Sequence, residues 1–351
     1  MRSSFHELTV AGIERLCDDA VAVSFDVPAE LTADFAFAPG QNLTLRRFVG
    51  EREERRQYSI CAPAGARPRI GVREVPDGLF SSWLVRELQP GDTIEVQAPS
   101  GSFVPDLETP ARHVLIAAGS GITPVLSIAS SVLAVPGSEV TLLYGNRRSS
   151  TVMFVDELAD LKDRYPSTLE LAHVLSREPR EAELFTGRLD AAKLRQLLPV
   201  LTSPSDVDHW WVCGPFEMIV STQEVLVELG VPVERVHREL FFVDVPPEPV
   251  KHEEPGVVGP SSEVTVILDG RTTSLPLARD TTVLEGAQRV RPDLPFACKG
   301  GVCGTCRARL TTGEVRMRRN FALEQAELDA GFVLTCQSLP ISDELTVDYD
   351  T

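Results

Sequence analysis

Four of the seven cysteines lie in the last 54 residues, and their spacing is the strongest chemical signal in the chain. Cys298, Cys303 and Cys306 are followed after 29 residues by Cys336, which gives the pattern C-x4-C-x2-C…C. This spacing is typical of plant-type [2Fe–2S] sites, in which four thiolates hold two bridged irons. The glycines of the loop let it wrap a cluster with its N–H groups toward the sulfurs. A structural zinc site is the alternative, but such sites favour two C-x2-C pairs and only one is present here.

The segment RQYS at residues 56–59 carries a second chemical signal. Alternation along a strand places Arg56 and Tyr58 on the same side. An arginine there can grip a pyrophosphate, and a tyrosine ring can lie against a flavin ring. Ser59 could hydrogen-bond flavin N5, the atom that receives a hydride. Taken alone, the pattern also fits any half-exposed strand, so the flavin interpretation depends on a second feature downstream.

That feature is the segment GLFS at 78–81, where the sequence predicts the start of a helix. N–H groups at a helix N-terminus bind phosphates, so Gly78 and Ser81 are candidates for holding the same pyrophosphate. An ordinary Asp-Gly turn with a serine cap is the alternative.

The segment GSGITP at 119–124 directly follows the apolar strand HVLIA and opens a predicted helix. Glycines allow close approach of the backbone to a dinucleotide phosphate, and the helix N-terminus supplies donors. Proline stands where a third glycine would be, so the pattern is not G-x-G-x-x-G. The candidate binding residues of this segment are Gly119, Gly121, Thr123 and Pro124.

Charge after the next two strands indicates which nucleotide is used. No acidic residue ends VTLLYGNRR to bind a ribose 2′-hydroxyl; Arg147 and Arg148 stand there instead, and Ser176 and Arg177 follow the next strand. Positive charge at this place favours a 2′-phosphate, so the sequence predicts NADPH rather than NADH. The alternative is that these arginines, Arg148 above all, are solvated loop charges.

Cys213 and Gly214 end the strand HWWVCG. Ligands bind at the carboxyl ends of strands in such sheets, which predicts contact of Cys213 with the nicotinamide. A buried cysteine at a strand end is more often just a small apolar residue. Glu239 and Phe241, in HRELFF, could close over the flavin, or they could belong to a strand that only contacts the barrel.

Three kinds of element must position these residues. Residues 6–104 contain many short β-branched and apolar runs separated by turn signals, which predicts an antiparallel barrel with one helix at 79–88. From residue 113, strands alternate with helices, which indicates a parallel sheet covered on both faces. The end of the chain opens with a hairpin around Asp269-Gly270 and a short helix at 283–290.

The predicted fold class is therefore multidomain. It combines an antiparallel β-barrel for FAD, a Rossmann-like α/β nucleotide domain and a small α+β domain, which the resemblance described below implies to be a ferredoxin of β-grasp form. Residues 244–262 contain five prolines and read as an extended linker. The predicted boundaries are 1–106 for the barrel, 107–243 for the nucleotide domain, 244–262 for the linker and 263–351 for the ferredoxin domain.

Length and charge bound the remaining possibilities. A chain of 351 residues suggests two or three domains, and its net charge of −17 excludes a nucleic-acid or anionic-membrane binder. No stretch approaches 18 consecutive apolar residues, and the N-terminus carries no apolar region typical of a signal peptide. We therefore expect a cytoplasmic protein without membrane or nucleic-acid partners.

Taken together, these motifs resemble the ferredoxin–NADP reductase superfamily over residues 1–243, fused to a plant-type ferredoxin over 263–351. The likeness is strongest to reductases that serve the phenylacetyl-CoA (ring 1,2-) epoxidase. The segments that carry it are FHELTVA (5–11), RRQYSIC (55–61), AAGSGITP (117–124), YGNR (144–147), ACKGGVCGTC (297–306) and LEQAELDAGFVLTCQ (323–337).

The resemblance implies an NADPH-dependent reductase that carries FAD and a [2Fe–2S] cluster and passes single electrons to an oxygenase. The expected partner is the di-iron phenylacetyl-CoA epoxidase, and the alternative partner is a steroid or aromatic hydroxylase. An alternative function of another class is that the chain is a non-enzymatic docking module with a structural zinc site. The expected catalytic residues are Ser59, Cys213 and Glu239, and the expected metal ligands are the four cysteines. The expected cofactor-binding residues are Arg56, Gln57, Tyr58, Ser59, Val72, Gly78, Ser81, Gly119, Gly121, Thr123, Pro124, Arg147, Ser176, Arg177, Gly214 and Phe241.

Overall fold

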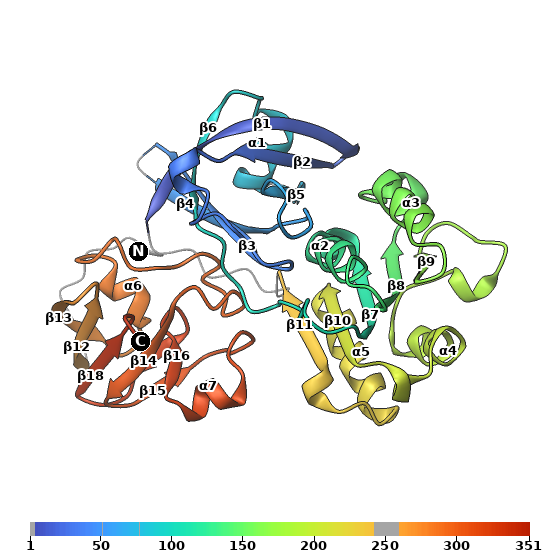
Figure 1. Ribbon diagram of the computed structural model, residues 1–351. Coiled ribbons are helices and arrows are strands. Elements are labelled where there is room, and N and C mark those ends of the chain that lie inside the picture. Colours follow the sequence, from blue (N-terminus) through green and yellow to red (C-terminus); the bar gives the residue numbers. More distant parts are fainter. Residues whose placement is uncertain (1–3, 51, 77, 242–259) are drawn as a thin grey trace. The chain divides into compact units, whose positions relative to one another are not determined.

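The computed structural model describes residues 4–50, 52–76, 78–241 and 260–351 (Figure 1). The chain forms two compact units, residues 1–241 and 242–351. Most of the linker predicted at 244–262 lies outside the described residues. The domain boundaries proposed above stay predictions, although the last barrel strand and the first strand of the parallel sheet fall on either side of position 106.

The first part of unit 1 is an antiparallel sheet that closes on itself. Among the described residues its strand order is β4-β3-β6-β1-β2-β5. A bridge between Ile60 and Ile70 joins the two edge strands at one end, which confirms the predicted barrel. Its interior is filled by apolar side chains such as Leu8, Leu43 and Leu45, all fully buried. The elements are β1 (Phe5–Cys17), β2 (Ala20–Asp26), β3 (Asn42–Val49), β4 (Arg52–Ser59), β5 (Arg69–Arg73), α1 (Leu79–Arg86) and β6 (Thr93–Gln97).

The second part of unit 1 is a parallel sheet of order β11-β10-β7-β8-β9 in the described residues. In Figure 1, α2 and α3 lie on one side of this sheet and α4 and α5 on the other. This arrangement confirms the predicted strand–helix alternation. The elements are β7 (Arg112–Ala118), α2 (Ile122–Val132), β8 (Glu139–Asn146), α3 (Val155–Arg164), β9 (Leu169–Leu175), α4 (Ala191–Leu201), β10 (His209–Gly214), α5 (Phe216–Glu228) and β11 (Val236–Leu240).

The described part of unit 2 is a mixed sheet of order β13-β12-β18-β14-β16, beside a short β15–β17 pair. The predicted hairpin is present: Asp269 and Gly270 both have positive φ, as a two-residue type I′ turn requires. The helix predicted at 283–290 is present but shorter, and it spans only Val283–Ala287. The elements are β12 (Ser261–Leu268), β13 (Arg271–Ala278), α6 (Val283–Ala287), β14 (Arg307–Thr312), β15 (Val315–Met317), α7 (Gln325–Asp329), β16 (Phe332–Leu334), β17 (Ser338–Pro340) and β18 (Glu344–Asp348).

Candidate functional site

The three residues expected to be catalytic lie together where the barrel meets the parallel sheet. Ser59 is the last residue of β4, and its hydroxyl donates to Oε2 of Glu239 at 3.3 Å. Glu239 lies on β11 and pairs in register with Cys213 on β10. Ser59 and Cys213 are almost completely buried. The fold therefore joins a hydroxyl, a carboxyl and a thiol from three separate strands.

The electrostatics of this cluster favour its neutral forms. Burial raises the pKa of Glu239 to about 8, while hydrogen bonds from Ser59 and Asn42 act in the opposite direction. Burial, followed by the charge of Glu239, raises the pKa of the Cys213 thiol well above its usual value. Near neutral pH the Glu239 carboxyl is therefore largely protonated and can hold or exchange a proton.

The RQYS segment lies on a barrel strand, as the sequence predicts, but at the end of β4 rather than at the start of a strand as we expected. The side chain of Arg56 is about half exposed and pairs with Glu54 at 3.0 Å. The Tyr58 ring lies 6.1 Å from that of Phe80, centre to centre, and burial raises the pKa of its hydroxyl. Gln57 points to the opposite side of the strand from these two. An accessible guanidinium and an aromatic ring thus occupy one side of β4.

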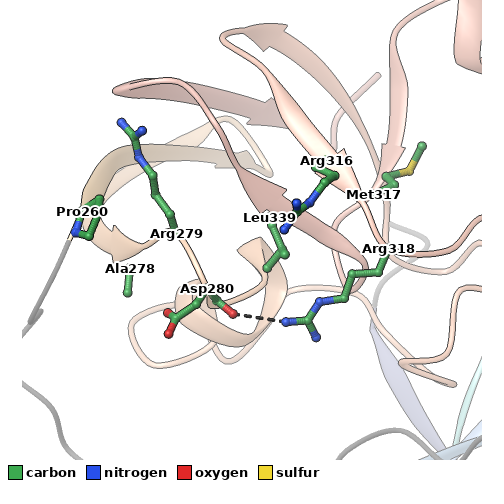
Figure 2. A pocket seen from close by; sticks show the side chains of 8 residues that line it. All are labelled: Pro260, Ala278, Arg279, Asp280, Arg316, Met317, Arg318 and Leu339. Carbon is green, nitrogen blue, oxygen red and sulfur yellow. Dashed lines mark hydrogen bonds between the residues drawn. The ribbon is translucent and has the colours of Figure 1, made fainter.

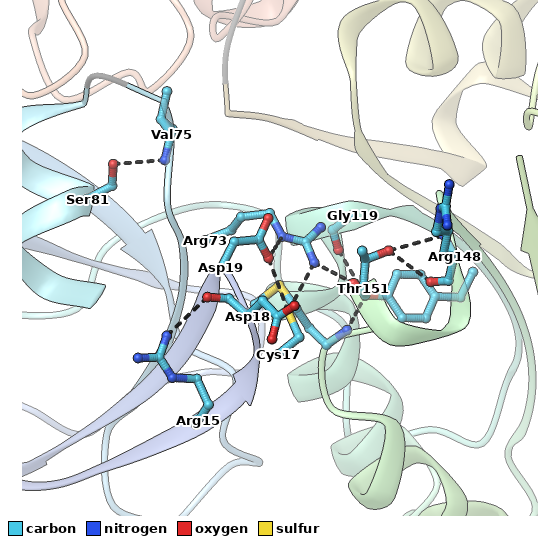
Figure 3. Close-up of polar contacts among 12 residues, drawn as sticks. Arg15, Cys17, Asp18, Asp19, Arg73, Val75, Ser81, Gly119, Arg148 and Thr151 are labelled. Atoms are coloured by element: carbon cyan, nitrogen blue, oxygen red, sulfur yellow. Dashed lines mark hydrogen bonds and ion pairs between the residues drawn. The ribbon is translucent and has the colours of Figure 1, made fainter. Parts of the chain in front are cut away.

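The turn before α1 uses the side chain proposed to bind phosphate. Ser81 Oγ accepts a hydrogen bond from Val75 N at 3.0 Å (Figure 3). It also donates to Gly78 O at 3.4 Å. Helix α1 has no side-chain cap, so N–H groups of its first turn can bind an anion. Val72 is fully buried in the barrel core, which leaves only its backbone for contact with a cofactor.

The GSGITP loop packs directly on the neighbouring strand. A Cβ at Gly121 would lie 2.1 Å from the carbonyl oxygen of Cys213, so only glycine fits there. The Thr123 hydroxyl donates to Ser120 O at 3.0 Å, and Pro124 is buried in the first turn of α2. Gly214 ends β10 beside this loop. The loop therefore brings its backbone to the carboxyl edge of the sheet, where phosphates bind in such folds.

Arg73 links the barrel to the turn after β8 and lies beside the GSGITP loop, and the sequence analysis did not identify it. From the end of β5 its Nε donates to Asp19 Oδ1 at 3.2 Å, and Nη2 donates to the Thr151 carbonyl (Figure 3). Its Nη1 lies 3.3 Å from the position that a Cβ on Gly119 would take. The Arg73 guanidinium thus lies beside the GSGITP loop (the glycine loop), where it could donate charge-assisted hydrogen bonds to an anionic ligand.

The arginines predicted to select the nucleotide lie at the carboxyl ends of β8 and β9. Arg177 N donates to Arg147 O at 2.8 Å, and Ser176 N donates to Asn146 O at 2.9 Å, so the two loops run side by side. The side chains of Arg147, Arg148 and Arg177 are exposed. In the described part of the chain none of these three makes an ion pair with a carboxylate. Phe241, the last described residue of unit 1, is also exposed.

The four clustered cysteines of unit 2 face one another as two pairs. The hydrogen bond with Cys303 lowers the pKa of Cys298 to about 6, and the one with Cys306 lowers that of Cys336. None of the four forms a disulfide. Gly300 N lies 3.3 Å from Cys298 Sγ and donates to it. Four thiols with backbone donors are the donor set that an iron–sulfur cluster requires.

Three family models match this chain, one for each part of the fold. The oxidoreductase FAD-binding domain matches residues 7–104, and the oxidoreductase NAD-binding domain matches residues 115–224. The 2Fe-2S iron-sulfur cluster binding domain matches residues 266–340. One component of the 1,2-phenylacetyl-CoA epoxidase of Escherichia coli (strain K12) is 41% identical over 99% of this chain and 98% of its own. The chain belongs to the ferredoxin–NADP reductase-like family with a C-terminal [2Fe–2S] domain.

Another curated relative and a solved structure match the reductase over nearly its full length. The ferredoxin reductase component of 3-ketosteroid-9-alpha-monooxygenase from Mycobacterium tuberculosis (strain CDC 1551 / Oshkosh) is 37% identical over 98% of this chain and 96% of its own. The crystallised phthalate dioxygenase reductase is 25% identical, with a TM-score of 0.59 and 98% of both chains covered.

The reductase is therefore the NAD(P)H-dependent flavin oxidoreductase component of an oxygenase. It uses FAD, a [2Fe–2S] cluster and a nicotinamide nucleotide, and its electron acceptor is an oxygenase component. When bound, FAD takes up a hydride and releases electrons singly, and the cluster carries one electron at a time. None of the helices in the described ranges combines the length and apolar character needed to span a bilayer.

An arginine-rich pocket of about 770 Å³ opens on unit 2 of the reductase (Figure 2). Arg279 pairs with Asp343, and Arg318 Nη2 donates to Asp280 O at 3.2 Å. Arg316 and Arg318 have no carboxylate ion pair within the described residues. The remaining lining residues are Pro260, Ala278, Met317 and Leu339.

This pocket borders the segment that carries the fourth cysteine. Met317 pairs with Ser338 between β15 and β17, and Arg318 N donates to Gln337 O at 2.9 Å. A partner that occupied the pocket would thus come close to Cys336.

Proposed function

We propose that this reductase takes electrons from NADPH in the cytoplasm and delivers them to the di-iron oxygenase of a phenylacetyl-CoA epoxidase. The observation that carries this proposal is the 41% identity to the Escherichia coli epoxidase component, which extends over nearly the full length of both chains. No residue described above would contact the oxygenase's substrate, so the partner rather than this chain determines what is oxidised.

The preference for NADPH is supported by the arginines after β8 and β9. Arg147 and Arg177 lie on adjacent, hydrogen-bonded loops. Within the described residues, neither side chain forms an ion pair with a carboxylate. A 2′-phosphate placed between them would gain charge-assisted hydrogen bonds, whereas a 2′-hydroxyl would not.

The proposed roles follow the placement of the side chains. Ser59, Cys213 and Glu239 would surround the site of hydride transfer, where burial favours the neutral form of the Glu239 carboxyl and the Ser59 hydroxyl hydrogen-bonds it. The FAD contacts would come from Arg56, Gln57, Tyr58, Val72, Gly78 and Ser81, and the nucleotide contacts from Gly119, Gly121, Thr123, Pro124, Arg147, Ser176, Arg177 and Gly214. Phe241 would cover the flavin, and Cys298, Cys303, Cys306 and Cys336 would hold the cluster.

A direct test is to compare two oxygenases as binding partners of the purified reductase. Its dissociation constants for the phenylacetyl-CoA epoxidase oxygenase subunits and for a 3-ketosteroid 9α-monooxygenase oxygenase are measured by calorimetry at the same ionic strength. We expect tighter binding to the epoxidase subunits. Tighter binding to the steroid oxygenase would favour the second candidate, which the 37% identity to the Mycobacterium tuberculosis reductase component supports.

A further inference from the structure

Gln337 directly follows the proposed cluster ligand Cys336, and its side chain is 8% exposed. Its amide nitrogen Nε2 lies 2.8 Å from Lys299 O, in the loop that carries the other three cysteines. The same nitrogen lies 3.0 Å from Cys336 O and 3.5 Å from Cys336 Sγ. One buried amide therefore connects the two segments that supply the cysteines, 38 residues apart.

The hydrogens of this amide are fully used by these contacts. A glutamine amide carries two N–H hydrogens, and three acceptors lie within reach of Nε2. If one hydrogen is donated to Lys299 O, the other is within reach of both the carbonyl oxygen and the sulfur of Cys336. The thiolate of the fourth ligand thus receives a side-chain donor, whereas Cys298 receives a backbone donor from Gly300.

The backbone around Gln337 holds the side chain in this place. Gln337 N donates to Leu334 O at 2.8 Å, and Gln337 O accepts from Arg318 N at 2.9 Å. Gly301, with φ of 80°, approaches so closely that a Cβ there would lie 3.0 Å from Gln337 Cγ. The amide is therefore fixed against the cysteine loop by contacts on both sides.

We propose that Gln337 is a positioning residue that raises the reduction potential of the [2Fe–2S] cluster through its N–H···S hydrogen bond to Cys336. This inference rests on Cys336 being a ligand and does not depend on which oxygenase receives the electrons. The reduced cluster carries one more negative charge than the oxidised cluster, and part of it resides on the ligand sulfurs. A donor to one of those sulfurs stabilises the reduced form more than the oxidised form.

The test uses the FAD- and cluster-loaded protein with Gln337→Met, which keeps the length and volume of the side chain but removes both N–H donors. The matched control is Gln325→Met on α7, where the amide donates to Asp329 and is exposed. The cluster potential is measured by redox titration followed by electron paramagnetic resonance. At a fixed solution potential, we expect the ratio of reduced to oxidised cluster to fall about tenfold in Gln337→Met, which corresponds to about 59 mV for a one-electron couple. The control should titrate like the wild type.

A second measurement on the wild-type protein guards against a variant that fails to load the cluster. Glutamine labelled with ¹⁵N at the side-chain amide should give a ¹⁵N coupling to the reduced cluster in pulsed electron paramagnetic resonance. Gln288→Met is the control, because Gln288 also bonds the loop that carries three of the cysteines, but through its side-chain oxygen, to Lys299 Nζ. The coupling should persist in this variant. An unchanged potential in cluster-loaded Gln337→Met, or the absence of the coupling in wild type, would overturn the proposal. Retention of the cluster by Cys336→Ala, which has no donor atom at this position, would instead show that the assumed ligand is wrong.

Discussion

Ser59 and Glu239 are 180 residues apart in the chain, yet the Ser59 hydroxyl donates to Glu239 Oε2 at 3.3 Å. This contact joins the end of a barrel strand to the edge strand of the parallel sheet. Glu239 in turn pairs with Cys213, whose carbonyl lies against Gly121 of the glycine loop. The proposed sites for flavin and nicotinamide thus share one hydrogen-bonded junction.

Removing the hydroxyl of this junction should slow flavin reduction. In Ser59→Ala the Glu239 carboxyl loses one of its two side-chain donors and keeps only Asn42, so the groups around the flavin lose their fixed geometry. We expect the rate of flavin reduction by NADPH to fall about a hundredfold, since misplacement by about 1 Å has that effect. Anaerobic stopped-flow absorbance measures this rate. Ser24→Ala on β2 is the control, and an equal loss in both variants would contradict the proposed role of Ser59.

Replacing Arg147 should weaken the use of NADPH selectively. Arg147→Ala removes a charge-assisted hydrogen bond to the 2′-phosphate, which is worth about 1.5–3 kcal/mol, or a roughly tenfold to hundredfold change in kcat/KM. The kcat/KM for NADH should stay within about twofold of wild type. Steady-state kinetics with both nucleotides checks this, with Arg164→Ala at the exposed end of α3 as control. An equal loss for NADPH and NADH would remove the NADPH assignment.

Loss of Cys336, the fourth cysteine, should stop electron transfer from the flavin to the oxygenase and leave reduction of the flavin intact. Cys336→Ser should lack the visible absorption and the electron paramagnetic resonance signal of the cluster, because the serine hydroxyl is a poor substitute for a thiolate. Ferricyanide reduction from the flavin should continue at near the wild-type rate, while reduction of the oxygenase should stop. Oxygenase reduction at the wild-type rate would show that electrons bypass the cluster.

Charge reversal at the arginine pocket should weaken docking of the oxygenase. Residues 263–351 contain more acidic than basic side chains in total. Arg316 and Arg318, which form no ion pair with a carboxylate in the described residues, therefore make a positively charged patch on an otherwise acidic unit. In Arg316→Glu/Arg318→Glu we expect the KM for the oxygenase to rise about tenfold at low salt, with a smaller difference at high salt. Flavin reduction should not change. Arg309→Glu on β14 is the control, and a similar rise in KM there would argue against a specific surface.

Acid should destabilise the nucleotide-binding part of the reductase through buried histidines. Burial, with a contribution from the charge of His209, lowers the pKa of His113 to about 4, and the same causes lower that of His237 to about 4. The unfolded chain binds these protons near pH 6.5, so the free energy of unfolding should fall as the pH drops from about 6.5 to about 4.

Denaturant titrations at several pH values, followed by the fluorescence of the three tryptophans Trp83, Trp210 and Trp211, measure this slope. His113→Gln keeps an acceptor for Trp211 Nε1, which bonds His113 at 3.3 Å, and should flatten the pH dependence. His6→Gln on β1 is the control. An equally steep slope in His113→Gln would show that other groups cause the acid sensitivity.

The elements and motifs were predictable because each depends on residues close together in the sequence. The cysteine loop, the glycine loop before α2 and the RQYS strand all carry their signals within ten residues. Arg73, Asn42 and Gln337 were not identified, because their contacts reach Thr151, Glu239 and Lys299, which are far away in the chain. A lone arginine, asparagine or glutamine in a strand or turn has no local signature of such a role.

Ser81 is the opposite case: the sequence identified the residue but not its contacts. Its position in a helix N-terminal turn was predicted correctly, but its hydroxyl already bonds Val75 N and Gly78 O. Whether a cofactor displaces those bonds depends on geometry that spacing alone does not contain. The serine cap and the phosphate contact were both consistent with the sequence for this reason.

The measurement that tests the central claim most directly is a reconstitution of the reductase with the oxygenase subunits of the phenylacetyl-CoA epoxidase, phenylacetyl-CoA and oxygen. NADPH consumption is compared with the amount of ring-epoxidised product. We predict one product per NADPH, and none when Cys336→Ser replaces the wild type. NADPH oxidation without product, together with coupled turnover of a 3-ketosteroid 9α-monooxygenase by the same reductase, would contradict the proposed partner.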